Sequence, residues 1–204
     1  MKLIKVKINN KEYKFLPKTS ILEALGEADI EIPSLCYLKD FLPQSTCGLC
    51  IVEVRGRGII RSCDNFIGED MEILTHTPVL EKMRYEILKL LYSQGHVGKC
   101  GSCPKREDCK LLKLVLKYKA YPLSNFLAGK NTLSEFKIGN ISFFPEKCIK
   151  CRLCIEACQK YGSGVIKIRG FGSNIKIIPP GPGCVGCGRC VQVCPVGAIV
   201  WNKK

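Results

Sequence analysis

Fifteen cysteines stand in four blocks along this 204-residue chain, and their spacing constrains the fold more than any other feature. Short, regular intervals such as Cys-x2-Cys are typical of ligands to metals and metal clusters. Met1 leads into alternating charged and apolar residues without a signal-peptide core, so we expect a reducing, cytoplasmic setting in which cysteines bind metal. The apolar runs are short, and we expect no membrane insertion.

The last two blocks repeat one another with the spacing Cys-x2-Cys-x2-Cys-x3-Cys. In this bacterial ferredoxin pattern, three thiolates hold one 4Fe-4S cube and the fourth reaches the cube of the other copy. A pair of zinc sites is the alternative, but zinc favours two Cys-x2-Cys pairs and explains neither the x3 spacing nor the following Pro195. Gln159 stands where Pro195 stands in the second copy, which leaves the turn after Cys158 open. The predicted ligand sets are Cys148, Cys151, Cys154 and Cys194 for one cube, and Cys158, Cys184, Cys187 and Cys190 for the other.

The second block combines a histidine with three cysteines, in the order His96-x3-Cys100-x2-Cys103-x5-Cys109. Because three thiolates lack a fourth partner, the pattern favours His96 as the fourth ligand of another 4Fe-4S cube over a loop residue or a helix cap. A neutral imidazole makes the site less negative and should raise the reduction potential of the cluster. His76 has no such neighbours, and we expect it to be structural.

The first block has the spacing Cys36-x10-Cys47-x2-Cys50-x12-Cys63. Four thiolates on a loop-rich surface suit a 2Fe-2S cluster, and Gly48 allows the backbone to approach inorganic sulfide closely. The spacing differs from the plant-type pattern, so the residues alone leave a zinc knuckle possible.

The intervening residues predict an α+β protein in three domains. Residues 1–77 are predicted to form a β-grasp 2Fe-2S ferredoxin domain: strands at 2–8 and 12–16 flank an Asn9-Asn10 turn, Thr19 or Ser20 caps a short helix ending near Gly26, and further strands lie at 51–54 and 71–74. Residues 139–204 are predicted to form a bacterial-type 2x(4Fe-4S) ferredoxin domain, with strand-forming residues after each cysteine repeat, at 164–168 and 197–201.

Between them, residues 78–138 are predicted to form a small helical His/Cys3 cluster domain. Thr77 followed by proline opens a first helix that ends by Gly95, and a second helix is expected over about 105–119. The apolar spacing predicts two inward faces, formed by Leu80, Met83, Ile87, Leu90 and Leu91 in the first helix and by Leu111, Leu112, Val115 and Leu116 in the second.

The net charge of +14 invites a nucleic-acid interpretation. If all fifteen thiols bind as thiolates to four cores of roughly 2+ each, about +7 remains, which suits docking onto acidic protein partners equally well. Arg106, Lys110, Lys113 and Lys117 form a basic stripe, which favours a solvated face over a docking surface. The basic residues lack interleaved aromatics, so a zinc-dependent nucleic-acid binder is the less favoured alternative and no nucleic-acid partner is expected.

The order of these motifs, from Leu3 to Val200, resembles the N-terminal part of the large iron–sulfur subunit of respiratory complex I and the N-terminal half of iron-only hydrogenases. By length it is most similar to the diaphorase iron–sulfur subunit of soluble NAD(P)-linked nickel–iron hydrogenases and related bifurcating complexes. The resemblance implies one 2Fe-2S cluster at Cys36, Cys47, Cys50 and Cys63 and three 4Fe-4S clusters at the sets given above. It also implies a hetero-oligomer with a flavoprotein NAD(P)H-binding subunit and the hydrogenase small and large subunits.

The expected function is therefore electron transfer between a flavin/NAD(P)H module and a hydrogenase module. No catalytic residue is predicted, because no Gly-rich dinucleotide loop follows a strand and no cysteine is left over for a hydrogen-activating centre. The alternatives are a subunit of an NAD-linked formate dehydrogenase and a free-standing polyferredoxin.

Overall fold

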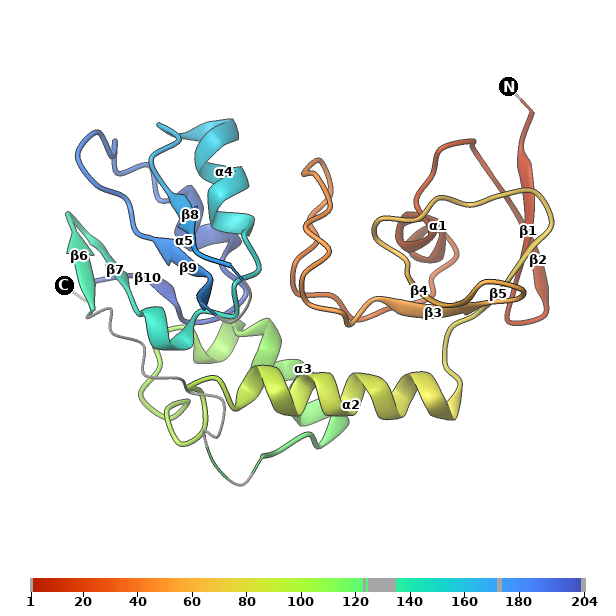
Figure 1. The fold of residues 1–204 in the computed structure, drawn as a ribbon, viewed down its shortest axis with the longest axis horizontal. Helices are drawn as coiled ribbons and strands as arrows, with labels where there is room; N and C mark the ends of the chain where they lie inside the picture. The colour runs from red at the N-terminus through yellow and green to blue at the C-terminus, as the bar shows by residue number, and fades with distance from the viewer. Residues whose placement is uncertain (1, 123, 125–134, 172–173, 203–204) are drawn as a thin grey trace.

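The structure is a computed structural model that describes residues 2–122, 124, 135–171 and 174–202. Its fold is α+β, as predicted. The largest sheet has five strands. Figure 1 shows this sheet at one end, a long helix running below it, and a group of small sheets and short helices at the other end. None of the helices in these described ranges has both the length and the hydropathy needed to cross a bilayer.

The N-terminal sheet has the strand order β2-β1-β5-β3-β4, in which β1 and β5 are parallel and the other neighbours are antiparallel. Asn9 and Asn10 join the first two strands with φ angles of 47° and 68°, which an Asn-Asn turn tolerates. The predicted strands and turn are thus confirmed. Strand β4 was not predicted, because its four residues do not alternate between apolar and polar side chains. The strands are β1 (Ile4–Ile8), β2 (Lys11–Phe15), β3 (Ile51–Val54), β4 (Gly58–Arg61) and β5 (Met71–Leu74).

Helix α1 (Ile21–Glu27) covers this sheet through Ile21, Ala24 and Leu25. Ser20 caps it, as one of the two predicted candidates, and Glu23 reaches back to the Ser20 backbone to complete a capping box.

Helix α2 (Pro78–Tyr92) begins as predicted, with Thr77 accepting a hydrogen bond from the Leu80 backbone. Its buried face differs from the prediction, because Arg84 and Leu88 are buried whereas Met83 and Leu90 are 38% and 43% exposed. Apolar periodicity places every charged residue outside. It cannot show that another segment supplies partners for a buried guanidinium.

The second predicted helix is shorter than expected. A 3-10 turn, η1 (Arg106–Asp108), precedes helix α3 (Lys110–Tyr118), since Cys109 is extended and caps α3 with its sulfur, which accepts from the Leu112 backbone at 3.4 Å. Leu111 and Val115 are buried as predicted, but Leu116 is 53% exposed.

In the C-terminal unit the cysteine repeat is visible in the backbone. Helix α4 (Leu153–Tyr161) and helix α5 (Arg189–Val193) each follow a residue in the left-handed region, Arg152 at φ 63° and Gly188 at φ 69°. Strands follow both copies but start later than expected, and the strands before the first copy were not predicted. They are β6 (Phe136–Ile138), β7 (Ile141–Phe143) and β10 (Ile199–Trp201) in one sheet, β8 (Lys167–Arg169) and β9 (Lys176–Ile178) in another, with a 3-10 turn η2 (Pro145–Lys147).

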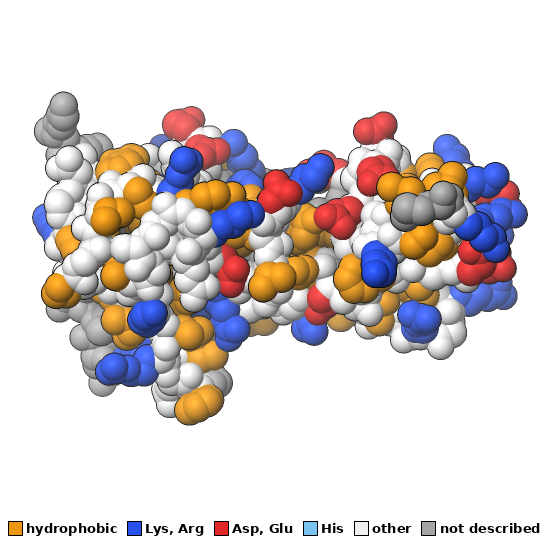
Figure 2. Space-filling model, turned by 90° about the horizontal axis from the view of Figure 1, so that it is seen from above, with side chains coloured by type: hydrophobic (Ala, Val, Ile, Leu, Met, Phe, Trp, Pro, Cys, Tyr) orange, Lys and Arg blue, Asp and Glu red, His pale blue; other side chains and the backbone are white. Residues whose placement is uncertain are grey.

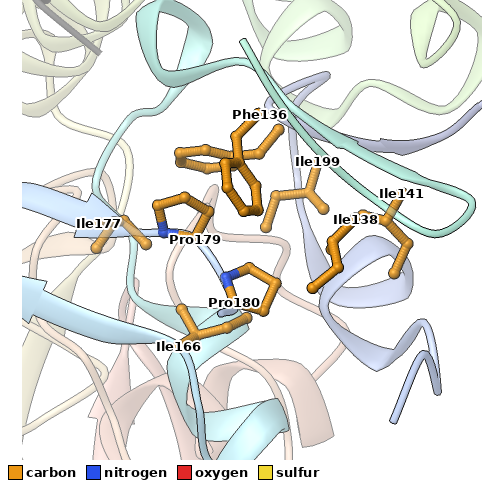
Figure 3. A pocket seen from close by; sticks show the side chains of 9 residues that line it. Phe136, Ile138, Ile141, Ile166, Ile177, Pro179, Pro180 and Ile199 are labelled. Carbon is orange, nitrogen blue, oxygen red and sulfur yellow. The ribbon is translucent and has the colours of Figure 1, made fainter. Parts of the chain in front are cut away.

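An apolar hollow lies between these two small sheets. Figure 3 shows Ile138, Ile141 and Ile199 on one side of it and Ile166, Ile177, Pro179 and Pro180 on the other. Ile141, Ile166 and Ile199 are also buried in one continuous core with Leu88 of α2 and Leu111 of α3. The C-terminal unit and the helices are therefore packed together as one body.

Surface ion pairs take up part of the basic excess. On the N-terminal sheet, where Figure 2 shows basic and acidic side chains intermixed, Lys5 bonds to Glu12 at 2.9 Å and Arg55 to Glu72 at 2.7 Å. In the predicted basic stripe, Lys117 bonds to Glu31 at 3.3 Å and Lys113 lies 3.9 Å from Asp108. Such solvent-exposed pairs add little to stability, because water screens them.

Candidate metal centres

The four cysteines of the first block are all buried at the edge of the N-terminal sheet. The sulfurs of Cys36 and Cys47 are 3.3 Å apart. The backbone N–H of Leu35 donates to the Cys47 sulfur at 3.5 Å, and the backbone N–H of Cys47 donates to the Cys36 sulfur at 3.4 Å. The thiols of each pair share one proton: the hydrogen bond between Cys36 and Cys47 lowers the pKa of Cys36 and raises that of Cys47, and the bond between Cys50 and Cys63 lowers the pKa of Cys50 and raises that of Cys63. Each pair therefore supplies a thiolate near neutral pH, the form that binds metal.

Gly48, between two of these cysteines, adopts a φ of 71°. A Cβ atom at this position would lie 3.5 Å from Cδ1 of Ile87 on α2. The loop thus needs the left-handed conformation and packs on the helix.

The histidine and the three cysteines of the second block line one hollow. His96 is 5% exposed, and its Nε2 is buried without a hydrogen-bond partner among the described residues. The ring also bonds the backbone of Lys147, while burial lowers its pKa to about 4, so the imidazole is neutral at physiological pH. A neutral ring with one nitrogen fixed by a backbone group and the other unpartnered has the arrangement of a metal ligand.

Basic side chains surround the same hollow, and they offset the charge of three thiolates. Lys99, Arg106 and Lys147 line it, and the buried Lys147 ammonium also lies 4.7 Å from the centre of the Phe144 ring. Sequence reasoning missed Lys147 because only the fold brings it next to the cysteines.

Gly95, next to His96, packs closely against the backbone of Glu146, which lies just before the ferredoxin repeat. Its φ is 112°, and an added Cβ would collide with the carbonyl oxygen of Glu146, next to the backbone that binds the His96 ring.

We expect Gly95→Ala to lower the free energy of unfolding by about 2–4 kcal/mol, from strain and overpacking. Chemical denaturation measures this change. Gly101→Ala is the matched control, since it has open space and no positive φ, and an equal loss in both variants would contradict the account.

The two ferredoxin sets also line one hollow each, and they do so with the crossed fourth cysteine. Cys194 lies with Cys148, Cys151 and Cys154 around one hollow, and Cys158 lies with Cys184, Cys187 and Cys190 around the other. Burial is the main cause that raises the pKa of the Cys190 thiol to about 11, and the negative charge of neighbouring thiolates such as Cys158 adds to it. Iron therefore has to displace the proton of this thiol when it binds.

The hollow at Cys148 contains a further buried donor. Arg152 lines it, and its Nε has no hydrogen-bond partner among the described residues. An inorganic sulfide or a thiolate would satisfy this N–H, so the donor set fits an iron–sulfur cube. Across the described part of the chain, no three His, Cys, Asp or Glu side chains are close enough together to hold a single metal ion.

The four ligand sets are neighbours. Cys36 and Cys47 of the first block lie in one buried core with Cys151 and Cys154 of the first ferredoxin run and Cys190 of the second. An added Cβ at Gly197 would collide with the Cys103 sulfur, so the His96 site abuts the loop after Cys194.

Comparison with known domain families agrees with this arrangement. Residues 1–78 match the family described as a 2Fe-2S iron–sulfur cluster binding domain, residues 78–120 match the iron hydrogenase 1-like iron–sulfur centre-binding domain, and residues 143–200 match the 4Fe-4S dicluster domain. The chain therefore carries iron–sulfur cluster binding domains of both the 2Fe-2S and the 4Fe-4S type, in this order.

Particular relatives are similar to this chain over most of its length. A subunit of an NADH-quinone oxidoreductase of Rhizobium meliloti (strain 1021) is 29% identical over 97% of this chain and 24% of its own length. Iron hydrogenase 1 of Clostridium pasteurianum is 35% identical over 75% of this chain and 27% of its own length. NADP-reducing hydrogenase subunit HndD of Solidesulfovibrio fructosivorans is 29% identical over 100% of this chain and 37% of its own length. The chain thus spans only a quarter to somewhat over a third of these relatives.

Among solved structures, a chain of an NAD+-reducing NiFe-hydrogenase in the H2-reduced state superposes with a TM-score of 0.82. The match covers 97% of this chain and 87% of that chain at 23% identity, so the two share a fold over nearly their whole length.

Proposed function

We propose that this chain is a non-catalytic electron-transfer subunit that holds one 2Fe-2S and three 4Fe-4S clusters. One observation supports it above the others: each of the three predicted 4Fe-4S ligand sets lines a single hollow, and the buried Nε2 of His96 has no hydrogen-bond partner among the described residues. When bound, such clusters accept and release single electrons. We assign them to the domains 1–77, 78–138 and 139–204, one 2Fe-2S cluster in the first, one 4Fe-4S in the second and two in the third.

The protein's own residues keep these sites close together. Cys36 and Cys47 of the first block share a core with cysteines of the ferredoxin repeat, and α4 carries one ligand of each proposed cube, Cys154 and Cys158. Because α4 is a single rigid element, the distance between the two proposed cubes is fixed. Ten of the fifteen cysteines are buried, and their apolar neighbours exclude water from these thiolates, which strengthens the charge interactions there. Cys187 is exposed, so the proposed cube at Cys184, Cys187 and Cys190 lies closest to solvent.

We further propose that electrons pass between a flavoprotein NAD(P)H-binding subunit and the hydrogenase small and large subunits, in a cytoplasmic hetero-oligomer. The fold shared with an NAD+-reducing NiFe-hydrogenase chain and the similarity to an NADP-reducing hydrogenase subunit favour this pairing. Relatives described as putative formate dehydrogenases of Staphylococcus aureus, 28% identical over 96% of this chain, support a formate-linked complex as the second candidate.

Isolation of the tagged chain from its own cells without oxygen tests this proposal. We expect it to purify with a flavoprotein, and NADH or NADPH should bleach the visible absorbance of its clusters. Hydrogen should bleach the same bands, whereas bleaching by formate instead would select the second candidate. A stable, isolated monomer whose clusters neither nucleotide reduces would contradict a subunit role and leave the free-standing polyferredoxin.

A further inference from the structure

A buried guanidinium connects helix α2 to the loop that carries the proposed 2Fe-2S ligands. Arg84 is 0% exposed. Its Nε donates to the carbonyl oxygen of Leu49 at 3.3 Å, and its Nη2 donates to that of Ile51 at 2.6 Å. Leu49 and Ile51 stand on either side of Cys50. The guanidinium therefore fixes the backbone before and after one cysteine sulfur.

The counter-charge of Arg84 lies farther from the cysteines and closer to solvent. Nη1 of Arg84 bonds Oε1 of Glu81 at 2.5 Å, and the Glu81 side chain is 39% exposed while that of Arg84 is fully buried. Tyr118, on α3, lies close to both groups, and burial is the main cause that raises the pKa of its hydroxyl. Water screens an exposed charge more than a buried one, so a net positive potential remains at the buried end, beside Cys50.

We propose that Arg84 is a positioning residue for the Cys47–Cys50 loop and that its charge raises the reduction potential of the 2Fe-2S cluster. This inference rests on the proposed function, because it takes Cys36, Cys47, Cys50 and Cys63 as the ligands of that cluster. Reduction adds one negative charge to the site, and a nearby buried cation stabilises the reduced state more than the oxidised one. Arg84 thereby makes this cluster a better electron acceptor.

Two variants of the full chain separate charge from hydrogen bonding. Arg84→Met keeps the length of the side chain but removes the charge and the donors, and it should shift the reduction equilibrium of the 2Fe-2S cluster at least tenfold toward the oxidised state, which is 59 mV for one electron. Arg84→Lys keeps the charge but cannot bond both carbonyls, so its shift should stay below threefold while thermal stability falls. A redox titration followed by electron paramagnetic resonance measures the first quantity, and thermal unfolding before cluster insertion measures the second.

Two further variants serve as controls. Lys82→Met removes an exposed charge two residues away and should leave the potential unchanged. Glu81→Gln removes the counter-charge and should shift the equilibrium toward the reduced state, opposite to Arg84→Met, and this variant keeps the proposal testable if Arg84→Met does not fold. Unshifted 2Fe-2S potentials in Arg84→Met or Glu81→Gln, with the signal intact, overturn the role of Arg84. Absence of any 2Fe-2S signal in the unaltered chain overturns the proposed site instead.

Discussion

Replacing Cys158 by serine should remove or degrade the cube held by Cys184, Cys187 and Cys190, although Cys158 belongs to the other cysteine run. The four cysteines line one hollow, and serine is a poor ligand for iron. Iron content should fall by roughly one atom, if a 3Fe cluster remains, to four atoms, if the cube is lost. Iron analysis and electron paramagnetic resonance of the anaerobically purified variant measure the loss.

Double substitutions show which cube is affected. If Cys158 and Cys184 hold the same cube, replacing both should cost little more iron than replacing one, whereas Cys158→Ser with Cys148→Ser should damage two cubes. Cys194→Ser is the symmetric test. Combined with Cys148→Ser, it should cost little more iron than either change alone, because both cysteines belong to the same proposed cube. The reverse pattern, with Cys158 and Cys148 acting together, would show that each run holds its own cube.

Changing His96 to cysteine should preserve the iron content but lower the potential of one 4Fe-4S cluster by on the order of 100 mV or more, because a thiolate adds a negative charge that the neutral imidazole lacks. His96→Ala should instead weaken or lose this cluster, since Nε2 has no replacement. A redox titration followed by electron paramagnetic resonance resolves the shifted signal.

His76→Gln is the matched control for this prediction. His76 contacts the neighbouring Thr75 hydroxyl at 2.7 Å through Nδ1 and does not line the hollow of His96, so its loss should leave all potentials unchanged. Identical titration curves for His96→Cys and the unaltered chain would show that His96 is not a ligand.

Local chemistry made part of this structure predictable. Thr77 followed by proline specifies where α2 begins, Asn9 and Asn10 specify the first turn, and the duplicated cysteine spacing predicts which cysteines share a hollow. Each of these features depends on residues only a few positions apart, or on a repeat that can be aligned with itself.

Features that depend on tertiary contacts were not predictable. The burial of Arg84 requires the carbonyls of Leu49 and Ile51, more than thirty residues away. The shortened α3 follows from Cys109 serving as a cap rather than as a helical residue. Likewise Lys147 reaches the His96 site only because the chain returns after α3. In each case distant backbone groups decide the outcome, and helical periodicity carries no information about them.

The central claim is that all fifteen cysteines and His96 bind clusters, and one measurement tests it most directly. Iron and acid-labile sulfide should be quantified in the chain purified without oxygen. The account predicts about fourteen of each per chain, from one 2Fe-2S and three 4Fe-4S clusters, with no stoichiometric zinc. Zinc bound at these cysteines without acid-labile sulfide would contradict it.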